Sequence, residues 1–229
     1  MRQTLAALFL FGVSFGYVEA AVVAYLRAIY DPIRQQLHPE RPKGDLFPLI
    51  TPEQLRAAGG PENTRRLAIE IGREAATMLM LAAVGLAVAR DSQQWLAAFL
   101  IGFGVWDISF YAFLRLIIDW PGSWLTWDLL FLLPVPWVGP VIAPILVSLT
   151  MIFCGVAALR RKIRIRALHW LAIISGGFII ILAFCWDFKN TSAGGLPNPF
   201  NWPLLGAGEL AGVTGFLAAV RNSQTTSAE

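Results

Sequence analysis

Eight chemically active side chains lie inside long apolar stretches of this 229-residue chain. A charge near the centre of a membrane-spanning helix costs roughly 2.5–3.5 kcal/mol even on the most lenient scales. Such side chains persist where they pair with one another, face a polar cavity, or hold a ligand or a proton. The predicted ligand- or proton-binding residues are Glu19, Glu70, Arg73, Glu74, Asp107, Tyr111, Arg115 and Glu209. The pattern assigns a catalytic role to none of them.

The densest group is Glu70, Arg73 and Glu74, which share one helical face with Thr77. Arg73 can neutralise one carboxylate and leaves the other to hold a proton, a cation or an arginine from another helix. Two interpretations are equally compatible with this spacing. The group is either a structural ion-pair cluster that fixes the register of the helices, or a ligand or proton site.

A second group follows the spacing i, i+4 and i+8, with Asp107, Tyr111 and Arg115 on one helical face. This spacing predicts a hydrogen-bonded ladder that satisfies its own polar groups. Asp107 lies near the middle of its apolar stretch, where a charge is most costly. A ligand or proton role for Asp107 therefore stands beside the structural one.

Glu19 and Glu209 each lie beside small residues that allow another helix to approach closely. Glu19 shares a face with Gly12 and Gly16, and Glu209 lies among Gly208, Gly212 and Gly215. Tight helix packing is the expected role of these glycines. The pattern predicts that the first and last spans press together and bring Glu19 near Glu209.

The composition of the chain indicates which kind of secondary structure carries these residues. The chain is 56% hydrophobic and 14% charged, whereas an average soluble domain is about 25% charged. Because ~20 apolar residues suffice to cross a bilayer, we predict an all-α polytopic membrane bundle that forms a single domain over residues 1–229. The expected spans are residues 5–26, 67–89, 95–118, 141–159, 168–188 and 204–220, the first being a retained span rather than a signal peptide.

Two segments interrupt this series. Residues 27–66 form a polar loop, in which Thr51, Pro52 and Gln54 predict a capping box that starts a short helix. Residues 123–140 combine a ten-residue helical pattern with tryptophans and three prolines. Ten helical residues span only about 15 Å, so we expect an interfacial or half-inserted helix here. A seventh, proline-kinked span is the alternative.

The distribution of basic residues bears on this choice. With seven spans the basic loops fall on one side of the membrane, as the positive-inside rule favours, whereas six spans divide them evenly. Helix length and the interfacial preference of tryptophan favour six spans, which we adopt. Every intramembrane carboxylate then lies in the leaflet next to loop 27–66, and residues 160–166 lie on the cytoplasmic side.

Three functions are compatible with these features. The first is binding or transport of a proton, a cation or a small polar ligand. The second is a membrane enzyme acting on a lipid or polyprenyl head group, with Arg73 or Arg115 stabilising phosphate charge. The third is a non-catalytic membrane subunit or assembly factor. Binding or transport is the leading hypothesis, and whether the chain is an enzyme stays open.

Cofactors and partners follow from which residue types are present. The chain has two histidines, and its cysteines Cys154 and Cys185 lack the spacing of a zinc or redox site. No cofactor is predicted, and a bound metal would be a hard cation such as Mg²⁺, Mn²⁺ or Ca²⁺. The expected partners are the lipid bilayer and a second copy or another membrane subunit, with no role for nucleic acid. The expected location is the inner or plasma membrane of a bacterium.

Overall fold

The computed structural model describes residues 2–225, and six of its helices are long and apolar enough to cross a membrane. These are α1 (Arg2–Leu37), α2 (Pro52–Val88), α3 (Ser92–Ile118), α4 (Ile142–Arg160), α5 (Ala167–Cys185) and α7 (Trp202–Thr225). The prediction of an all-α, six-span membrane bundle is confirmed. A seventh helix, α6 (Phe188–Ser192), is a short turn outside the spans.

Residues 123–140 correct the expectation of an interfacial or half-inserted helix. They form an antiparallel hairpin of β1 (Trp127–Phe131) and β2 (Trp137–Pro140), with Asp128 opposite Gly139. Pro134 and Pro136 stop a helix from continuing, and β2 supplies the ladder hydrogen bonds that a lone extended segment lacks. A short apolar run does not reveal its helix or strand state by periodicity alone, which explains the wrong prediction.

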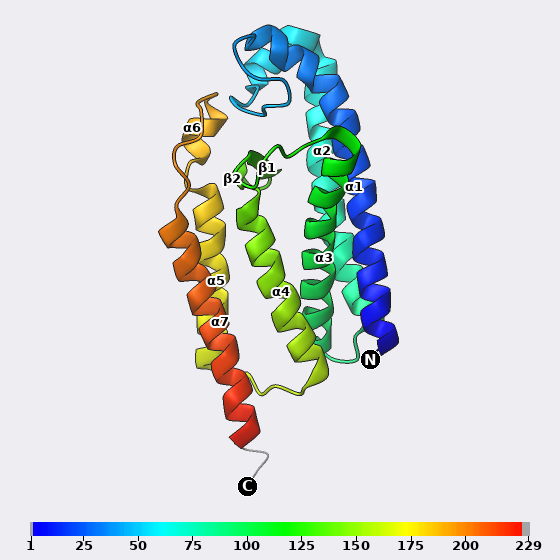
Figure 1. Ribbon diagram of the computed structural model, residues 1–229, viewed down its shortest axis with the longest axis vertical. Coiled ribbons are helices and arrows are strands. Elements are labelled where there is room, and N and C mark those ends of the chain that lie inside the picture. The colour runs from blue at the N-terminus through cyan, green and yellow to red at the C-terminus, as the bar shows by residue number, and fades with distance from the viewer. Residues whose placement is uncertain (1, 226–229) are drawn as a thin grey trace.

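The polar segment 27–66 is more helical than expected. Helix α1 continues beyond the apolar run to Leu37, and α2 already begins at Pro52. The predicted capping box is present, because the Gln54 amide donates to Thr51 Oγ1 over 3.3 Å and the Thr51 amide donates to Gln54 Oε1 over 2.9 Å. The end of α1 and the start of α2 therefore extend above the hairpin at one end of the molecule (Figure 1).

Helices α1, α2 and α3 form one side of the bundle. Helix α1 packs closely on α3, where a Cβ atom on Gly16 would lie 2.9 Å from the backbone nitrogen of Phe110. A small cluster of Phe15, Leu81 and Trp106 joins all three helices. These contacts fix the helix faces that carry the charged residues.

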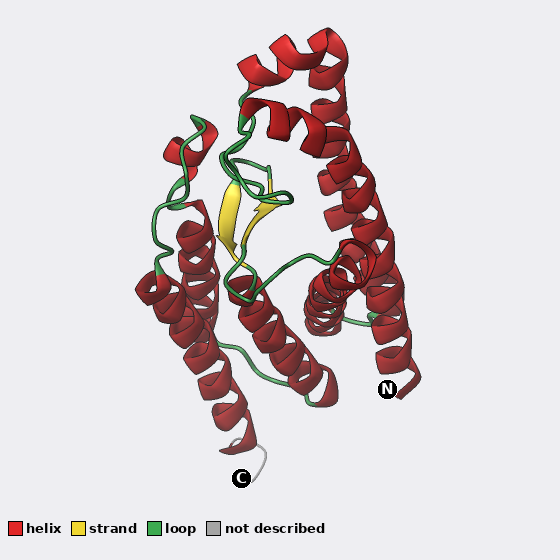
Figure 2. Cartoon of the chain, turned by 45° about the horizontal axis from the view of Figure 1, so that its top comes forward, coloured by secondary structure: helices red, strands yellow, loops and turns green. Residues whose placement is uncertain are grey.

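Helices α5 and α7 pair on the opposite side of the bundle (Figures 1 and 2). Their contact also depends on glycine, since a Cβ atom on Gly176 would lie 2.5 Å from the backbone nitrogen of Gly212. The prediction that the first and last spans press together is wrong, because α3 and α4 lie between them. The glycines do mediate tight packing, but each stripe packs against a different helix from the one expected.

The start of α1, residues 89–91, residues 161–166 and the end of α7 lie at one end of the bundle, while loop 38–51, the hairpin and α6 lie at the other (Figure 1). This is the arrangement that six spans require. The seven-span alternative is not formed, because the hairpin leaves and re-enters the bundle at the same end.

Candidate functional site

A cavity of ≈ 430 Å³ lies between α1, α2, α3 and the hairpin, at the end of the bundle that carries loop 38–51. We call it the central cavity. It reaches the surface beside Pro52 and Ser192, which are both exposed. Charged side chains from four elements line it, namely Glu19, Arg27, Arg34, Glu70, Arg73, Glu74, Asp107 and Asp128.

Arg73 links α1 to α2 across the cavity. Its Nε donates to both oxygens of Glu70 at 3.0 Å, and another guanidinium nitrogen binds the buried carboxylate of Glu19. Thr77 Oγ1 donates to the second oxygen of Glu19 over 3.1 Å. The positive charge of Arg73 is therefore shared between two carboxylates, one from its own helix and one from α1.

Glu74 links α2 to the hairpin. One carboxylate oxygen accepts a hydrogen bond of 2.9 Å from the backbone N–H of Leu132, and the residue is 7% exposed. This donor is neutral, so the hydrogen bond orients Glu74 without neutralising it. Arg73 attracts Glu74 electrostatically as well, although the ion pairs of Arg73 are with Glu19 and Glu70.

The expected ladder of Asp107, Tyr111 and Arg115 is not formed. Asp107 accepts a hydrogen bond of 2.8 Å from Ser148 Oγ on α4, and Tyr111 donates to Asp128 on the hairpin over 2.8 Å. Arg115 lies near the exposed end of α3, where it donates to the backbone oxygen of Asp119 over 2.7 Å. Asp107 and Tyr111 therefore hydrogen-bond to residues of neighbouring elements rather than to residues of their own helix.

Asp107 and Asp128 form a buried acidic pair in the central cavity. They are 8% and 6% exposed, and close enough to interact electrostatically. Burial raises the pKa of Asp128 above its usual range, although the Tyr111 hydroxyl and the charge of Arg27 act in the opposite direction. Sequence periodicity could not reveal this pair, because Asp128 lies on the hairpin.

Aromatic side chains line the same cavity as this acidic pair. Trp106, Phe110 and Tyr111 of α3 and Phe131 of β1 all line the central cavity. The rings of Trp106 and Phe131 are 6.3 Å apart, and those of Phe110 and Tyr111 are 5.2 Å apart. The cavity therefore combines carboxylates with aromatic side chains, a residue type whose ring faces attract cations.

Arg27 is a cavity residue that the sequence did not single out. It is 8% exposed, its guanidinium carbon lies 4.2 Å from the centre of the Trp120 ring, and it donates to the Gly44 backbone oxygen over 2.9 Å. Its position directly after the apolar run resembled an ordinary membrane-edge arginine. The continuation of α1 to Leu37 is what encloses it beneath loop 38–51.

Glu209 lies outside the central cavity. It belongs to α7 and interacts with Thr150 and Cys154 of α4. The predicted approach of Glu19 to Glu209 is therefore wrong, since their helices occupy opposite sides of the bundle. Of the eight predicted site residues, Glu19, Glu70, Arg73, Glu74, Asp107 and Tyr111 share the cavity, whereas Arg115 and Glu209 do not.

The positions of the possible metal-ligating side chains show whether they could hold a metal ion together. Within residues 2–225, no three histidine, cysteine or carboxylate side chains converge closely enough to hold a metal ion. The carboxylates of the central cavity instead bond to Arg73, to hydroxyl groups and to a backbone amide. Comparisons with protein-family models, with curated proteins and with solved structures give no match for this chain.

Proposed function

We propose that this integral membrane protein binds a small organic cation with an apolar body in the central cavity. The observation that carries the proposal is the buried pair of Asp107 and Asp128 in a cavity that the aromatic side chains of Trp106 and Tyr111 also line. Carboxylates and aromatic rings together favour ammonium-type groups, while apolar walls favour the rest of such a molecule.

The charge balance of the cavity supports a cation over an anion. Arg73 is shared by Glu19 and Glu70, and Arg34 pairs with Asp31. Glu74 and Asp107 are hydrogen-bonded to neutral donors, and Arg27 is the positive charge nearest Asp128. Positive charge brought by a ligand would lower the cost of burying these carboxylates.

The central cavity reaches the surface at one end of the bundle, and this supports ligand binding as the activity of the protein. Below the cavity, a cluster of Leu8, Ala98, Ile101 and Val105 closes the space between α1 and α3. Transport would require this cluster to open towards the opposite side. The same arrangement is compatible with one state of an alternating-access transporter. The binding site would be the same in a binding protein and in a transporter.

The other two functions have less support from the geometry. In the lipid-enzyme hypothesis Arg73 or Arg115 stabilises phosphate, but Arg73 is held by two carboxylates and Arg115 lies outside the cavity. The subunit hypothesis draws support from the way each buried carboxylate joins two elements. A binding test with matched variants separates it from the proposal.

The test uses the purified full-length chain and three probes of similar shape: benzyltrimethylammonium, its neutral isostere neopentylbenzene, and the anion benzenesulfonate. We expect the cation to bind best, measured by tryptophan fluorescence and by the shift in melting temperature. The substitution Asp107→Asn should weaken cation binding by about tenfold, because it removes a buried charge and preserves side-chain shape.

Glu209→Gln is the matched control, since it neutralises an intramembrane carboxylate outside the central cavity. It should leave the affinity for benzyltrimethylammonium unchanged. Equal binding of all three probes, or equal affinities for the Asp107→Asn and Glu209→Gln variants, would contradict the proposal and favour a purely structural role for the charges.

A further inference from the structure

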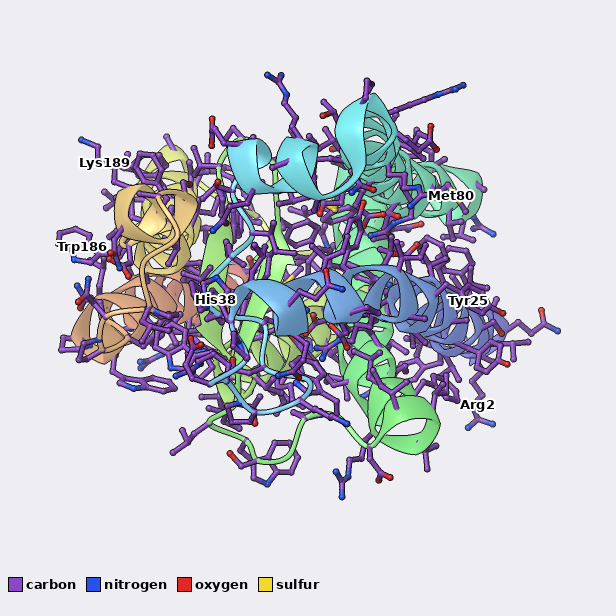
Figure 3. The ribbon with its side chains drawn as sticks, turned by 90° about the horizontal axis from the view of Figure 1, so that it is seen from above. Arg2, Tyr25, His38, Met80, Trp186 and Lys189 are labelled. Atoms are coloured by element: carbon purple, nitrogen blue, oxygen red, sulfur yellow. The ribbon has the colours of Figure 1, made fainter. Side chains whose placement is uncertain are left out.

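Cationic side chains gather at the end of the bundle where α1 starts and α7 ends. Five of them belong to residues 160–166, the segment between α4 and α5, and all five are exposed: Arg160, Arg161, Lys162, Arg164 and Arg166. Arg2 adds a positive charge at the edge of the molecule (Figure 3). Among the described residues at this end, Asp91 carries the one acidic side chain. This end of the bundle is therefore strongly positive.

The cations of residues 160–166 have no ion-pair partner among residues 2–225. At the opposite end, by contrast, Arg34 pairs with Asp31 and Arg41 pairs with Asp45. Positive charges held close together repel one another, and an anion between them removes this cost. The segment is therefore able to bind an anion from outside the described chain.

Hydrogen bonds to Gln93 of α3 hold the backbone of residues 161–166 in place. The side-chain amide of Gln93 donates to the backbone oxygens of Ala158 and Arg161 over 2.8 and 2.7 Å, and its carbonyl oxygen accepts from the backbone N–H of Ile163 over 3.1 Å. Ile163 itself is 6% exposed and packs in an apolar cluster of α3, α4 and α7 residues. The segment is therefore a fixed part of the fold.

The extended course of this segment places three cations on one side. The backbone is extended at Arg161 and at Arg166. Successive side chains of an extended chain point to opposite sides, so the buried position of Ile163 turns Lys162 and Arg164 outward, and Arg166 follows on the same side. Positions two apart lie about 7 Å from each other. These three cations line a hollow of ≈ 370 Å³ between the segment, α3 and the end of α7, which has room for the phosphate of a lipid head group.

We propose that residues 160–166 form a binding site for an anionic phospholipid. Helix α4 ends at Arg160 and α5 begins at Ala167, so the segment lies where two spans leave the hydrocarbon and where lipid head groups lie. Cationic side chains beside the end of a span attract anionic head groups. None of the residues of this segment lines the central cavity, so the proposal is independent of cation binding there.

The lipid fits the site with its phosphate over the hollow and its acyl chains along α5. Lys162, Arg164 and Arg166 offer N–H donors to the phosphate oxygens. In the first turns of α5, the side chains of Leu168 and Leu171 are 74% and 64% exposed and give the acyl chains an apolar surface. The site thus distinguishes an anionic lipid from soluble phosphate, which gains nothing from the two leucines.

The experiment uses the full-length chain, stripped of lipid in a neutral detergent and kept in phosphate-free buffer. Three probes are titrated at equal ionic strength: dioctanoyl phosphatidylglycerol, dioctanoyl phosphatidylcholine and glycerol 1-phosphate. The second has the same chains but no net charge, and the third has the charged phosphate but no chains. We expect phosphatidylglycerol to bind about tenfold more tightly than either, measured by native mass spectrometry and by the rise in melting temperature.

Two variants with the same loss of charge separate this site from general attraction. The site variant is Lys162→Gln, Arg164→Gln, Arg166→Gln. The control variant, which removes three exposed cations at the opposite end, is Lys43→Gln, Arg56→Gln, Arg65→Gln. The site variant should weaken phosphatidylglycerol binding by about tenfold, whereas the control variant should keep the affinity of the unaltered chain.

Asp91→Asn tests the site in a variant that keeps every cation. Asp91 lines the hollow and caps α3 by accepting a hydrogen bond of 2.8 Å from the backbone N–H of Gln94. Because asparagine caps a helix about as well as aspartate does, the change removes the negative charge and leaves the cap in place. It should strengthen phosphatidylglycerol binding.

Three outcomes would overturn the phospholipid site. The first is equal affinity for phosphatidylglycerol and phosphatidylcholine, which would exclude recognition of the head-group charge. The second is equal affinity for phosphatidylglycerol and glycerol 1-phosphate, which would assign the segment to soluble phosphate. The third is equal affinity of the site and control variants for phosphatidylglycerol, together with no effect of Asp91→Asn.

Discussion

At the scale of single residues, the buried charges of this protein join elements that are far apart in sequence. Glu19 contacts Arg73 across α1 and α2, and Asp107 contacts Ser148 across α3 and α4. Removing one member of such a pair leaves an uncompensated charge, which costs more than the pair itself contributes. Substitutions can therefore separate structural pairing from ligand binding.

Arg73→Met is expected to lower the free energy of unfolding by about 3 kcal/mol, because it leaves Glu19 and Glu70 close together without a counter-charge. The triple variant Glu19→Gln, Glu70→Gln, Arg73→Met should recover most of this loss. Unfolding in mixed detergent micelles measures both, with Arg65→Met as the exposed control. A triple variant no more stable than Arg73→Met would show that uncompensated charge is not the cause.

Asp128 should make stability depend on pH. Because burial raises its folded-state pKa, the folded chain binds a proton more tightly than the unfolded chain does. Stability should therefore fall as the pH rises from the ordinary aspartate pKa of about 3.9 through the folded value. In Asp128→Asn this fall should be smaller across the same range, as followed by melting temperature. Identical pH profiles for the two proteins would exclude this contribution of Asp128.

At the scale of elements, glycines decide which helices approach closely. A Cβ atom on Gly176 would lie 2.5 Å from the Gly212 nitrogen and 2.7 Å from the Gly208 oxygen, both of which are backbone atoms. Backbone atoms cannot move aside as a flexible side chain does. The contact of α5 with α7 therefore depends on Gly176 in a way that the glycine stripe alone does not reveal.

Gly176→Ala is expected to destabilise the fold by about 1–3 kcal/mol, because the two helices must separate to admit the methyl group. Gly177→Ala is its matched control on the same helix, since nothing lies within 4 Å of the added Cβ atom. Alanine also favours the helix over glycine, so the control should be neutral or stabilising. Equal melting temperatures for the two variants would argue against the close approach of α5 and α7.

At the scale of the whole molecule, the central cavity lies at the end opposite the start of α1 and the end of α7. The basic residues 160–166 predict that the end bearing the termini is cytoplasmic. The central cavity would then open to the outer side of the membrane. This orientation determines from which side of the membrane a ligand would enter the central cavity.

Membrane-impermeant thiol labelling measures the orientation in a Cys154→Ser, Cys185→Ser background. One cysteine replaces Pro42 and, in a second variant, one replaces Lys162; both positions are exposed and lie at opposite ends of the bundle. In right-side-out vesicles we expect the first to react and the second to be protected. Protection of both sites together would contradict the six-span arrangement. Labelling at position 162 with protection at position 42 would place the central cavity on the cytoplasmic side.

The class of fold and most of the cavity's polar residues can be predicted from the sequence alone. A charge within an apolar run is visible without knowledge of the fold, because its burial is costly wherever the helix packs. Glu19, Glu70, Arg73, Glu74 and Asp107 were found in this way. The capping box at Thr51 was equally visible, because all of its hydrogen bonds are local.

Which of these residues contact one another depends on how the helices pack. Periodicity assigns a residue to a face of its own helix but does not say which helix that face contacts, so Glu19 was expected near Glu209 and lies instead against Arg73. The hairpin that contributes Asp128 depends on a strand pairing between β1 and β2. The burial of Arg27 depends on a loop folding back over α1. These are contacts between distant segments, and their free energy resides in the pairing rather than in either segment alone.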